Sequence, residues 1–98
     1  MRFKFKKRKL KVLYEEDKGA NKYDQGVVDA FFEVMDVIKA ARDERDIREL
    51  KSLRYEKLKG KRQHERSLRL TGRWRLIVAI EKDDKGKYFL VKEIEDYH

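Results

Sequence analysis

Apolar and polar residues alternate with a period of two through the last third of the chain. The alternation occupies three runs: Ser67–Leu70, Trp74–Glu81 and Tyr88–Glu95. Such a pattern is typical of strands that bury one face. The runs are separated by Thr71–Arg73 and by Asp83–Gly86, and each of these connections contains a glycine. The sequence therefore predicts three successive strands joined by tight turns.

The first half of the chain contains a strong helical period. The segment Val27–Ala41 carries a wide apolar face, formed by Val27, Val28, Phe31, Phe32, Val34, Met35 and Ile38. Three carboxylates lie on the opposite side at helical spacing: Asp29, Glu33 and Asp36. The pattern predicts an amphipathic helix, and Asp24 is expected to cap its first turn through its side chain.

Shorter elements surround this helix. Arg2–Phe5 alternates basic and aromatic residues and predicts a first strand. Lys7–Asp17 has the spacing of a modest amphipathic helix, which we expect to stop at Gly19. Residues 43–51 predict one more short helical piece capped by Asp43. The main elements follow the order β-α-α-β-β-β, and we expect one α+β domain over residues 1–98.

The composition narrows the class of protein. The 98 residues include no cysteine, which excludes disulfides and thiolate metal sites. No apolar run approaches the roughly 20 residues that span a bilayer, and the first residues lack the apolar segment of a secretory signal. The sequence therefore predicts a cytoplasmic protein.

Positive charge is concentrated in two segments of the chain. The net charge is +8, and the isoelectric point is about 9.7. Residues 2–11 hold seven cations and no acid, and residues 54–75 hold nine cations and two acids. Each segment therefore carries +7, and the remainder of the chain carries −6. This distribution indicates an anionic partner, which could be nucleic acid, an anionic membrane surface or an acidic protein.

Two arginines stand out within the second basic segment. Arg69 lies between Leu68 and Leu70, and Arg75 lies between Trp74 and Leu76. Both side chains should therefore project together from the sheet face opposite the core. Two guanidinium groups on adjacent strands match the geometry of a phosphate, and Lys59 precedes them in a loop. The other interpretation is a solvated sheet face that only keeps the protein soluble.

The chain ends with Asp96-Tyr97-His98, directly after a predicted strand. Histidine and tyrosine can move protons or donate to a developing oxyanion, and the carboxylate beside His98 should favour its protonated form. His64 lies in a charged loop and is expected to be exposed. The helix carboxylates lack a histidine partner, so we expect neither a metal nor another cofactor.

Four short motifs in order resemble the HigB branch of the RelE-type toxins, which belong to bacterial toxin–antitoxin modules. The motifs are L-K-G-K-R at Leu58–Arg62, S-L-R-L at Ser67–Leu70, W-R-L at Trp74–Leu76 and E-D-Y-H at Glu95–His98. The resemblance covers the whole chain. It implies a RelE-like fold, with a small, twisted and mainly antiparallel sheet packed against two helices. It also implies a ribosome-dependent endoribonuclease that cuts translated mRNA in the A site without a metal.

The resemblance also implies roles for individual residues. The catalytic set by position is Lys59, Arg69, Arg75, Tyr97 and His98. The residues expected to contact RNA are Lys57, Lys61, Arg62, Arg66, Arg73 and Asp96. Some members carry a histidine where this chain has Glu56. The general base therefore stays open between Glu56, a neutral His98 and Tyr97.

Partners follow from the same resemblance. A HigA-like helix-turn-helix antitoxin is expected to bind the toxin, and operator DNA is bound only through that complex. The 30S ribosomal A site and its mRNA are the expected targets, and no membrane is involved. Two other interpretations stay open: a non-catalytic RNA- or ribosome-binding protein, and an adaptor whose basic surface binds an acidic protein.

Overall fold

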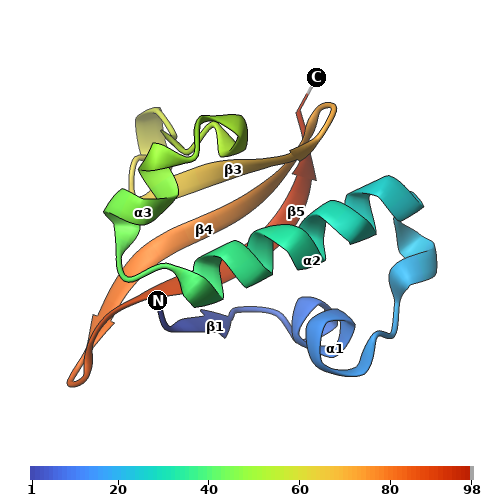
Figure 1. Ribbon diagram of the computed structural model, residues 1–98, viewed down its shortest axis with the longest axis horizontal. Coiled ribbons are helices and arrows are strands. Elements are labelled where there is room, and N and C mark those ends of the chain that lie inside the picture. Colours follow the sequence, from blue (N-terminus) through green and yellow to red (C-terminus); the bar gives the residue numbers. More distant parts are fainter. Residues whose placement is uncertain (98) are drawn as a thin grey trace.

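A computed structural model describes residues 1–97 as three α-helices and a five-stranded sheet (Figure 1). The helices are α1 (Arg8–Glu16), α2 (Gln25–Ala40) and α3 (Glu44–Glu49). The strands are β1 (Phe3–Phe5), β2 (Glu56–Lys57), β3 (Glu65–Thr71), β4 (Trp74–Asp83) and β5 (Gly86–Asp96). Three short 3-10 turns complete the chain: η1 (Ala20–Lys22), η2 (Lys51–Leu53) and η3 (Gly60–Arg62).

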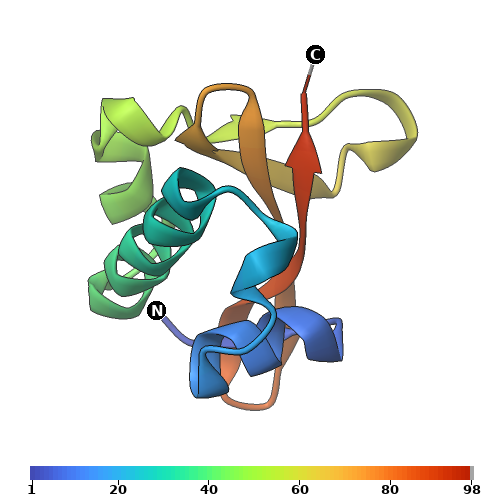
Figure 2. The same ribbon diagram turned by 90° about the vertical axis from the view of Figure 1, so that its right-hand side faces the viewer.

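The sheet has the strand order β1-β5-β4-β3-β2. β1 pairs with β5 in parallel, and the other neighbours are antiparallel. The helix α2 lies across one face of the sheet, and the loop around η3 projects from the other (Figure 2). The predicted α+β class and the mainly antiparallel sheet are confirmed. The two-residue strand β2 was not predicted, because two residues give no detectable alternation.

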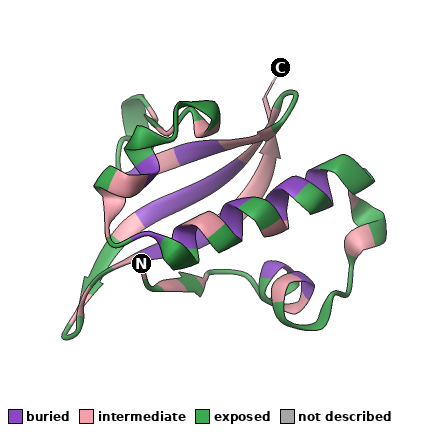
Figure 3. Ribbon diagram, in the orientation of Figure 1, coloured by how far each residue is buried: buried purple, intermediate pink, exposed green. Residues whose placement is uncertain are grey.

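The core lies between α2 and the sheet, with α1 closing one end (Figure 3). Phe31, Met35 and Ile38 are completely buried on α2. Leu68 on β3 and Phe89 on β5 are completely buried on the side of the sheet that faces α2. Burial of each such side chain contributes about 1.5–3 kcal/mol. The apolar periods of the sequence therefore predicted the core correctly.

Two helix ends differ from the expectation. The Asp24 carboxylate makes no capping hydrogen bond; instead its backbone carbonyl accepts hydrogen bonds from the amides of Val27 and Val28. The helix α1 ends at Glu16, and Asp17 adopts the left-handed conformation (φ 53°) expected of Gly19. A short polar side chain tolerates this conformation better than most. Asp43 caps α3 as predicted, because its carboxylate accepts a hydrogen bond of 2.9 Å from the Arg45 amide.

The strand register separates two faces of the sheet. Leu68 pairs with Leu76, and both are buried on the face covered by α2, which we name the closed face. Arg69 pairs with Arg75 and therefore projects with it to the opposite side, as predicted. We name that side the open face and define it by the cross-strand residues Glu56, Glu65, Ser67, Arg69, Arg75, Ile77, Glu93 and Glu95. The name refers to the side of the sheet opposite α2, since Glu65, Ser67 and Ile77 are themselves buried.

Within residues 1–97, no helix combines the length and the apolar character needed to cross a membrane.

Candidate functional site

Arg75 stands at the centre of the open face. Its guanidinium carbon lies 5.6 Å from the centroid of the Tyr97 ring, a distance at which cation–π attraction operates. Its Nε and Nη1 atoms are buried and have no hydrogen-bond partner in the described part of the chain. Buried donors usually find a partner. The guanidinium of Arg75 is therefore not fully hydrogen-bonded within the described chain, and the residue as a whole is half-buried.

Arg69 is the direct cross-strand neighbour of Arg75. Like charges at such paired positions destabilise a sheet, and no carboxylate within residues 1–97 forms an ion pair with either arginine. The pairing is unfavourable for the folded chain alone. It is favourable once an anion lies between the two guanidinium groups.

Tyr97 is held beside this pair by the backbone. Its amide donates a hydrogen bond of 2.7 Å to the carbonyl of Arg73, and the Arg73 side chain forms an ion pair of 2.7 Å with Asp96. These contacts fix the end of β5 next to the start of β4. The predicted site residues Tyr97, Arg73 and Asp96 therefore lie close together. His98, the predicted acid, lies outside the described residues.

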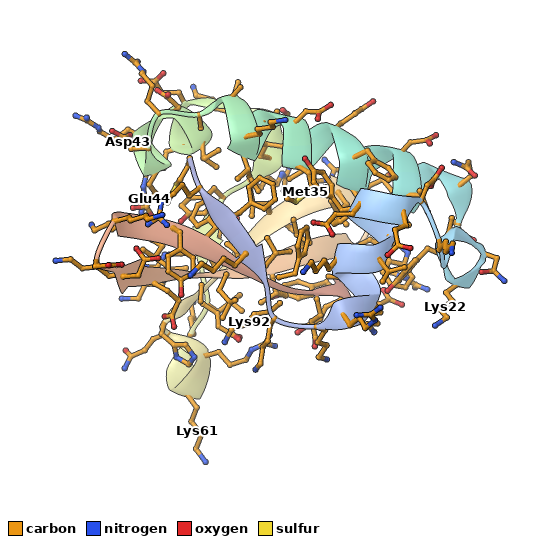
Figure 4. The ribbon with its side chains drawn as sticks, turned by 90° about the horizontal axis from the view of Figure 1, so that it is seen from below. Lys22, Met35, Asp43, Glu44, Lys61 and Lys92 are labelled. Atoms are coloured by element: carbon orange, nitrogen blue, oxygen red, sulfur yellow. The ribbon has the colours of Figure 1, made fainter. Side chains whose placement is uncertain are left out.

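The loop around η3 carries the exposed lysines. Gly60 adopts a positive φ of 66°, which lets the chain turn between Lys59 and Lys61. Both lysines are exposed, and Lys61 extends from the tip of the loop in Figure 4. Their ammonium groups can move over the open face but are not fixed to it.

Arg62 follows these lysines and forms ion pairs with two acids, Glu65 and Glu95. Its Nη1 and Nη2 atoms donate to the two oxygens of Glu95 at 3.0 and 2.6 Å, and its Nε donates to Glu65. Lys92 donates to the second oxygen of Glu65 at 2.8 Å. Burial alone would raise the pKa of Glu65, but the hydrogen bonds from Lys92 and Arg62 lower it below its ordinary value. The two carboxylates also raise the pKa of Arg62.

Arg66 and Lys57 point to the closed side of the sheet. Arg66 pairs with Val78 and with Lys57 in register, and its Nε lies 3.9 Å from Glu44. The Tyr55 hydroxyl donates to the same Glu44 carboxylate at 2.6 Å, and burial together with this contact raises the pKa of Tyr55. The predicted RNA contact of Arg66 is therefore separated from the open face by the sheet itself. The period of two indicated this, since Arg66 lies two residues before the buried Leu68.

Besides Glu65, the open face carries three acids: Glu56, Glu93 and Glu95. Glu56 pairs with Ser67, is exposed, and forms no ion pair within residues 1–97. Glu93 and Glu95 alternate with Ile94 on β5, and the hydrogen bond of 2.8 Å from Lys7 lowers the pKa of Glu93. Sequence reasoning did not place Glu93 and Glu95 in the site, although their alternation with Ile94 put them on one face.

Among residues 1–97, no group of three or more histidine, cysteine, aspartate or glutamate side chains is placed to hold a metal ion.

Comparisons with known proteins agree with this architecture. The model of a family described as the RelE-like toxin of type II toxin–antitoxin system HigB matches residues 3–97. No curated protein sequence matches the chain. Among solved structures, a YoeB/ParE toxin from Agrobacterium tumefaciens is similar in fold, with a TM-score of 0.59, 13% sequence identity and 100% of each chain covered. This chain therefore belongs to the HigB family of RelE-like toxins of type II toxin–antitoxin systems.

Proposed function

We propose that this toxin is a metal-independent endoribonuclease that cuts translated mRNA in the ribosomal A site. The observation that carries the proposal is the Arg69–Arg75 pair, in which Arg75 has two buried, unpartnered N–H donors beside Tyr97. Such donors suit a phosphate whose negative charge increases during the reaction.

The reaction needs three kinds of group. A base removes the proton of the 2′-OH, the 2′-oxygen attacks the adjacent phosphorus, and an acid protonates the departing 5′-oxygen. The products are a 2′,3′-cyclic phosphate and a 5′-hydroxyl. Arg75 and Arg69 would stabilise the pentavalent phosphorane, and Lys59 would add charge from its loop. We assign the acid role to His98 and the orientation of the nucleotide to Tyr97, which can stack on a base.

Glu56 is our candidate for the general base. It projects from the open face, opposite Ser67. Since Ser67 lies two residues from Arg69, Glu56 is separated from the arginine pair by roughly 7 Å along the strand direction. Because no cation pairs with its carboxylate in the described chain, the group can accept a proton from the 2′-OH. Tyr97 and a neutral His98 are the other candidates.

The site would be incomplete without the ribosome. Lys59 and Lys61 are exposed on a loop, and Glu56 is at the short edge strand β2. Catalytic groups that are not held in place give slow reactions, and correct positioning of both reactants supplies large accelerations. We therefore propose that the 30S A site supplies the mRNA conformation and that free RNA is a poor substrate.

The proposal extends to the partner and the compartment. The antitoxin would be a HigA-like helix-turn-helix protein that brings acidic groups to the +8 chain. Operator DNA would be bound through the complex of both proteins, and the site of action would be the cytoplasm, where translation takes place.

Induced expression in bacteria tests the function. Wild type and the Arg75→Ala variant are expressed, and cuts are mapped by primer extension on a translated mRNA and on the same mRNA with its start codon removed. We expect growth arrest and cuts inside the reading frame for wild type only, and no cuts in the untranslated mRNA. If the folded wild type produces neither arrest nor cuts, the protein is a non-catalytic binder. In that case Arg75→Ala should weaken RNA or ribosome binding and its dependence on salt.

A further inference from the structure

The loop that carries Lys59 has little apolar anchoring. All residues from Lys59 to His64 are exposed. The backbone contacts of the loop are few: the amides of Leu58, Arg62 and Gln63 donate to the carbonyls of Glu65, Lys59 and Gly60 at 3.1, 3.4 and 3.2 Å. The Arg66 side chain also donates to the Gln63 carbonyl at 3.0 Å, which ties the loop to β3. A segment with these properties opens easily in solution. The position of this loop relative to β5 therefore depends on a side-chain contact.

Arg62 supplies that contact. Its two terminal guanidinium nitrogens donate to the two oxygens of Glu95, 33 residues further along the chain, and its Nε donates to Glu65. Glu65 and Lys92 are mostly buried, with side-chain exposed fractions of 11% and 14%. The four groups Glu95, Arg62, Glu65 and Lys92 form an alternating network of zero net charge, which we name the clamp. A bidentate arginine–carboxylate pair fixes orientation as well as distance.

The clamp joins the two halves of the candidate site. Glu95 pairs in register with Arg75 and immediately precedes Asp96 and Tyr97. Arg62, the partner of Glu95 in the clamp, is the last residue of η3 and lies three residues after Lys59. The Arg62 side chain thus ties the lysine loop to β5, the strand that Tyr97 follows.

We propose that Arg62 is a positioning residue of this toxin, which holds the Lys59 loop against Glu95 beside Arg75, and that it is not a ligand of the RNA phosphates. The inference rests on the proposed ribonuclease function. Arg62 donates three of its five guanidinium N–H groups to Glu95 and Glu65, so a phosphate could use at most the remaining two, beside two carboxylates that repel it. Arg69 and Arg75, which form no ion pair within residues 1–97, are the open-face arginines with the most unpaired donors.

The test compares Arg62→Ala, Arg62→Lys, Glu95→Gln and the double variant Arg62→Ala/Glu95→Gln. Each purified protein is assayed for mRNA cleavage on programmed ribosomes, for the hydrogen exchange of amides 58–63, and for thermal unfolding. Arg42→Ala is the matched control, because Arg42 also pairs with an acid, Asp46, but is 88% exposed and is remote from the open face.

We expect Arg62→Ala and Glu95→Gln to slow cleavage by a similar factor, about ten- to hundred-fold. The double variant should be no slower than either single variant, because both remove the same contact. Arg62→Lys keeps the charge but cannot span both carboxylates, so it should also be slow. Amides 58–63 should exchange faster in all four variants, while the melting temperature falls by less than about 8 °C.

If Arg62 instead contacts the RNA phosphate directly, the Glu95→Gln variant should give the opposite result. Glu95→Gln would then free Arg62 and leave cleavage equal or faster, and Arg62→Lys would keep most of the rate; either outcome overturns the inference. Normal cleavage in all variants also overturns it, and leaves the proposed function intact. If wild type does not cut mRNA on ribosomes, the proposed function fails and the positioning role fails with it.

Discussion

The two faces of one sheet use arginine in different ways. On the closed face, Arg66 lies near Glu44 beside the buried Tyr55, and its charge is balanced within the protein. On the open face, Arg69 and Arg75 pair with each other in register and Arg75 keeps two unpartnered donors. Arg66 and Arg69, three residues apart on β3, thus lie on opposite faces of the sheet in different surroundings. Arg66 has a carboxylate beside it, whereas no carboxylate within residues 1–97 forms an ion pair with Arg69 or Arg75.

Truncation in the core should give the largest effect on stability. Phe31 is completely buried between α2 and the sheet, so Phe31→Ala should lower the free energy of unfolding by about 3–5 kcal/mol. Urea unfolding followed by circular dichroism measures this change. The exposed Lys39 on the same helix is the control, and Lys39→Ala should change stability by less than about 0.5 kcal/mol. Equal losses for both variants would contradict the assigned core.

Removal of the open-face arginine should act on the reaction instead. Arg75→Ala should reduce cleavage on ribosomes by about 10²–10³-fold, since it removes donors aimed at the developing charge. The free energy of unfolding should stay within about 0.5 kcal/mol of wild type, because the lost donors have no partner in the described chain. Single-turnover kinetics and urea unfolding measure the two quantities. A large loss of stability with normal cleavage would show that Arg75 serves the fold.

Two tyrosines allow the faces to be compared with one small change. Tyr55→Phe removes the hydroxyl that donates to Glu44 at 2.6 Å on the closed face. It should lower the free energy of unfolding by about 1–2 kcal/mol and leave cleavage unchanged. Tyr97→Phe should leave stability unchanged and slow cleavage if the hydroxyl takes part in proton transfer. The same effect on both measurements in both variants would remove the distinction between the faces.

Acid should weaken the open face through Glu65. The folded-state pKa of Glu65 is below its ordinary value of 4.5, because Lys92 and Arg62 favour the ionised form. A carboxyl group with a lowered pKa contributes stability above its unfolded pKa, and that stability is lost as the pH falls through the folded pKa. Urea unfolding between pH 6 and about pH 3 should therefore show a smaller decline in Glu65→Gln than in wild type. An equal decline in both proteins would exclude this contribution.

The sequence was most informative where residues near each other decide the structure. Alternation placed Leu68 and Leu76 in the core and Arg69 with Arg75 on the other side, because strand geometry fixes side-chain direction locally. The sequence predicts that α1 stops at Gly19, since glycine is the usual left-handed residue. Gly19 has a positive φ of 90°, but Asp17 is also left-handed (φ 53°) and the helix already ends there.

Contacts between distant segments could not be predicted in this way. The clamp joins Arg62 to Glu95 across 33 residues, and one unpaired residue at Lys92 shifts the β4–β5 register between Ile77 and Val78. Nothing in the local sequence around Arg62 distinguishes a clamped arginine from a free one. The RNA contact predicted for Arg62 rested on the family resemblance and on its positive charge, neither of which identifies the partner of the side chain.

The most direct test of the central claim is cleavage of one mRNA, free and on purified programmed ribosomes, by wild type and by Arg75→Ala, with ribosome binding measured in parallel. We predict that wild type cuts the A-site codon on ribosomes and cuts free RNA far more slowly. We predict that Arg75→Ala still binds the ribosome but does not cut. Loss of ribosome binding in Arg75→Ala, with no cleavage by wild type on either substrate, would contradict the claim and identify the open face as a binding surface.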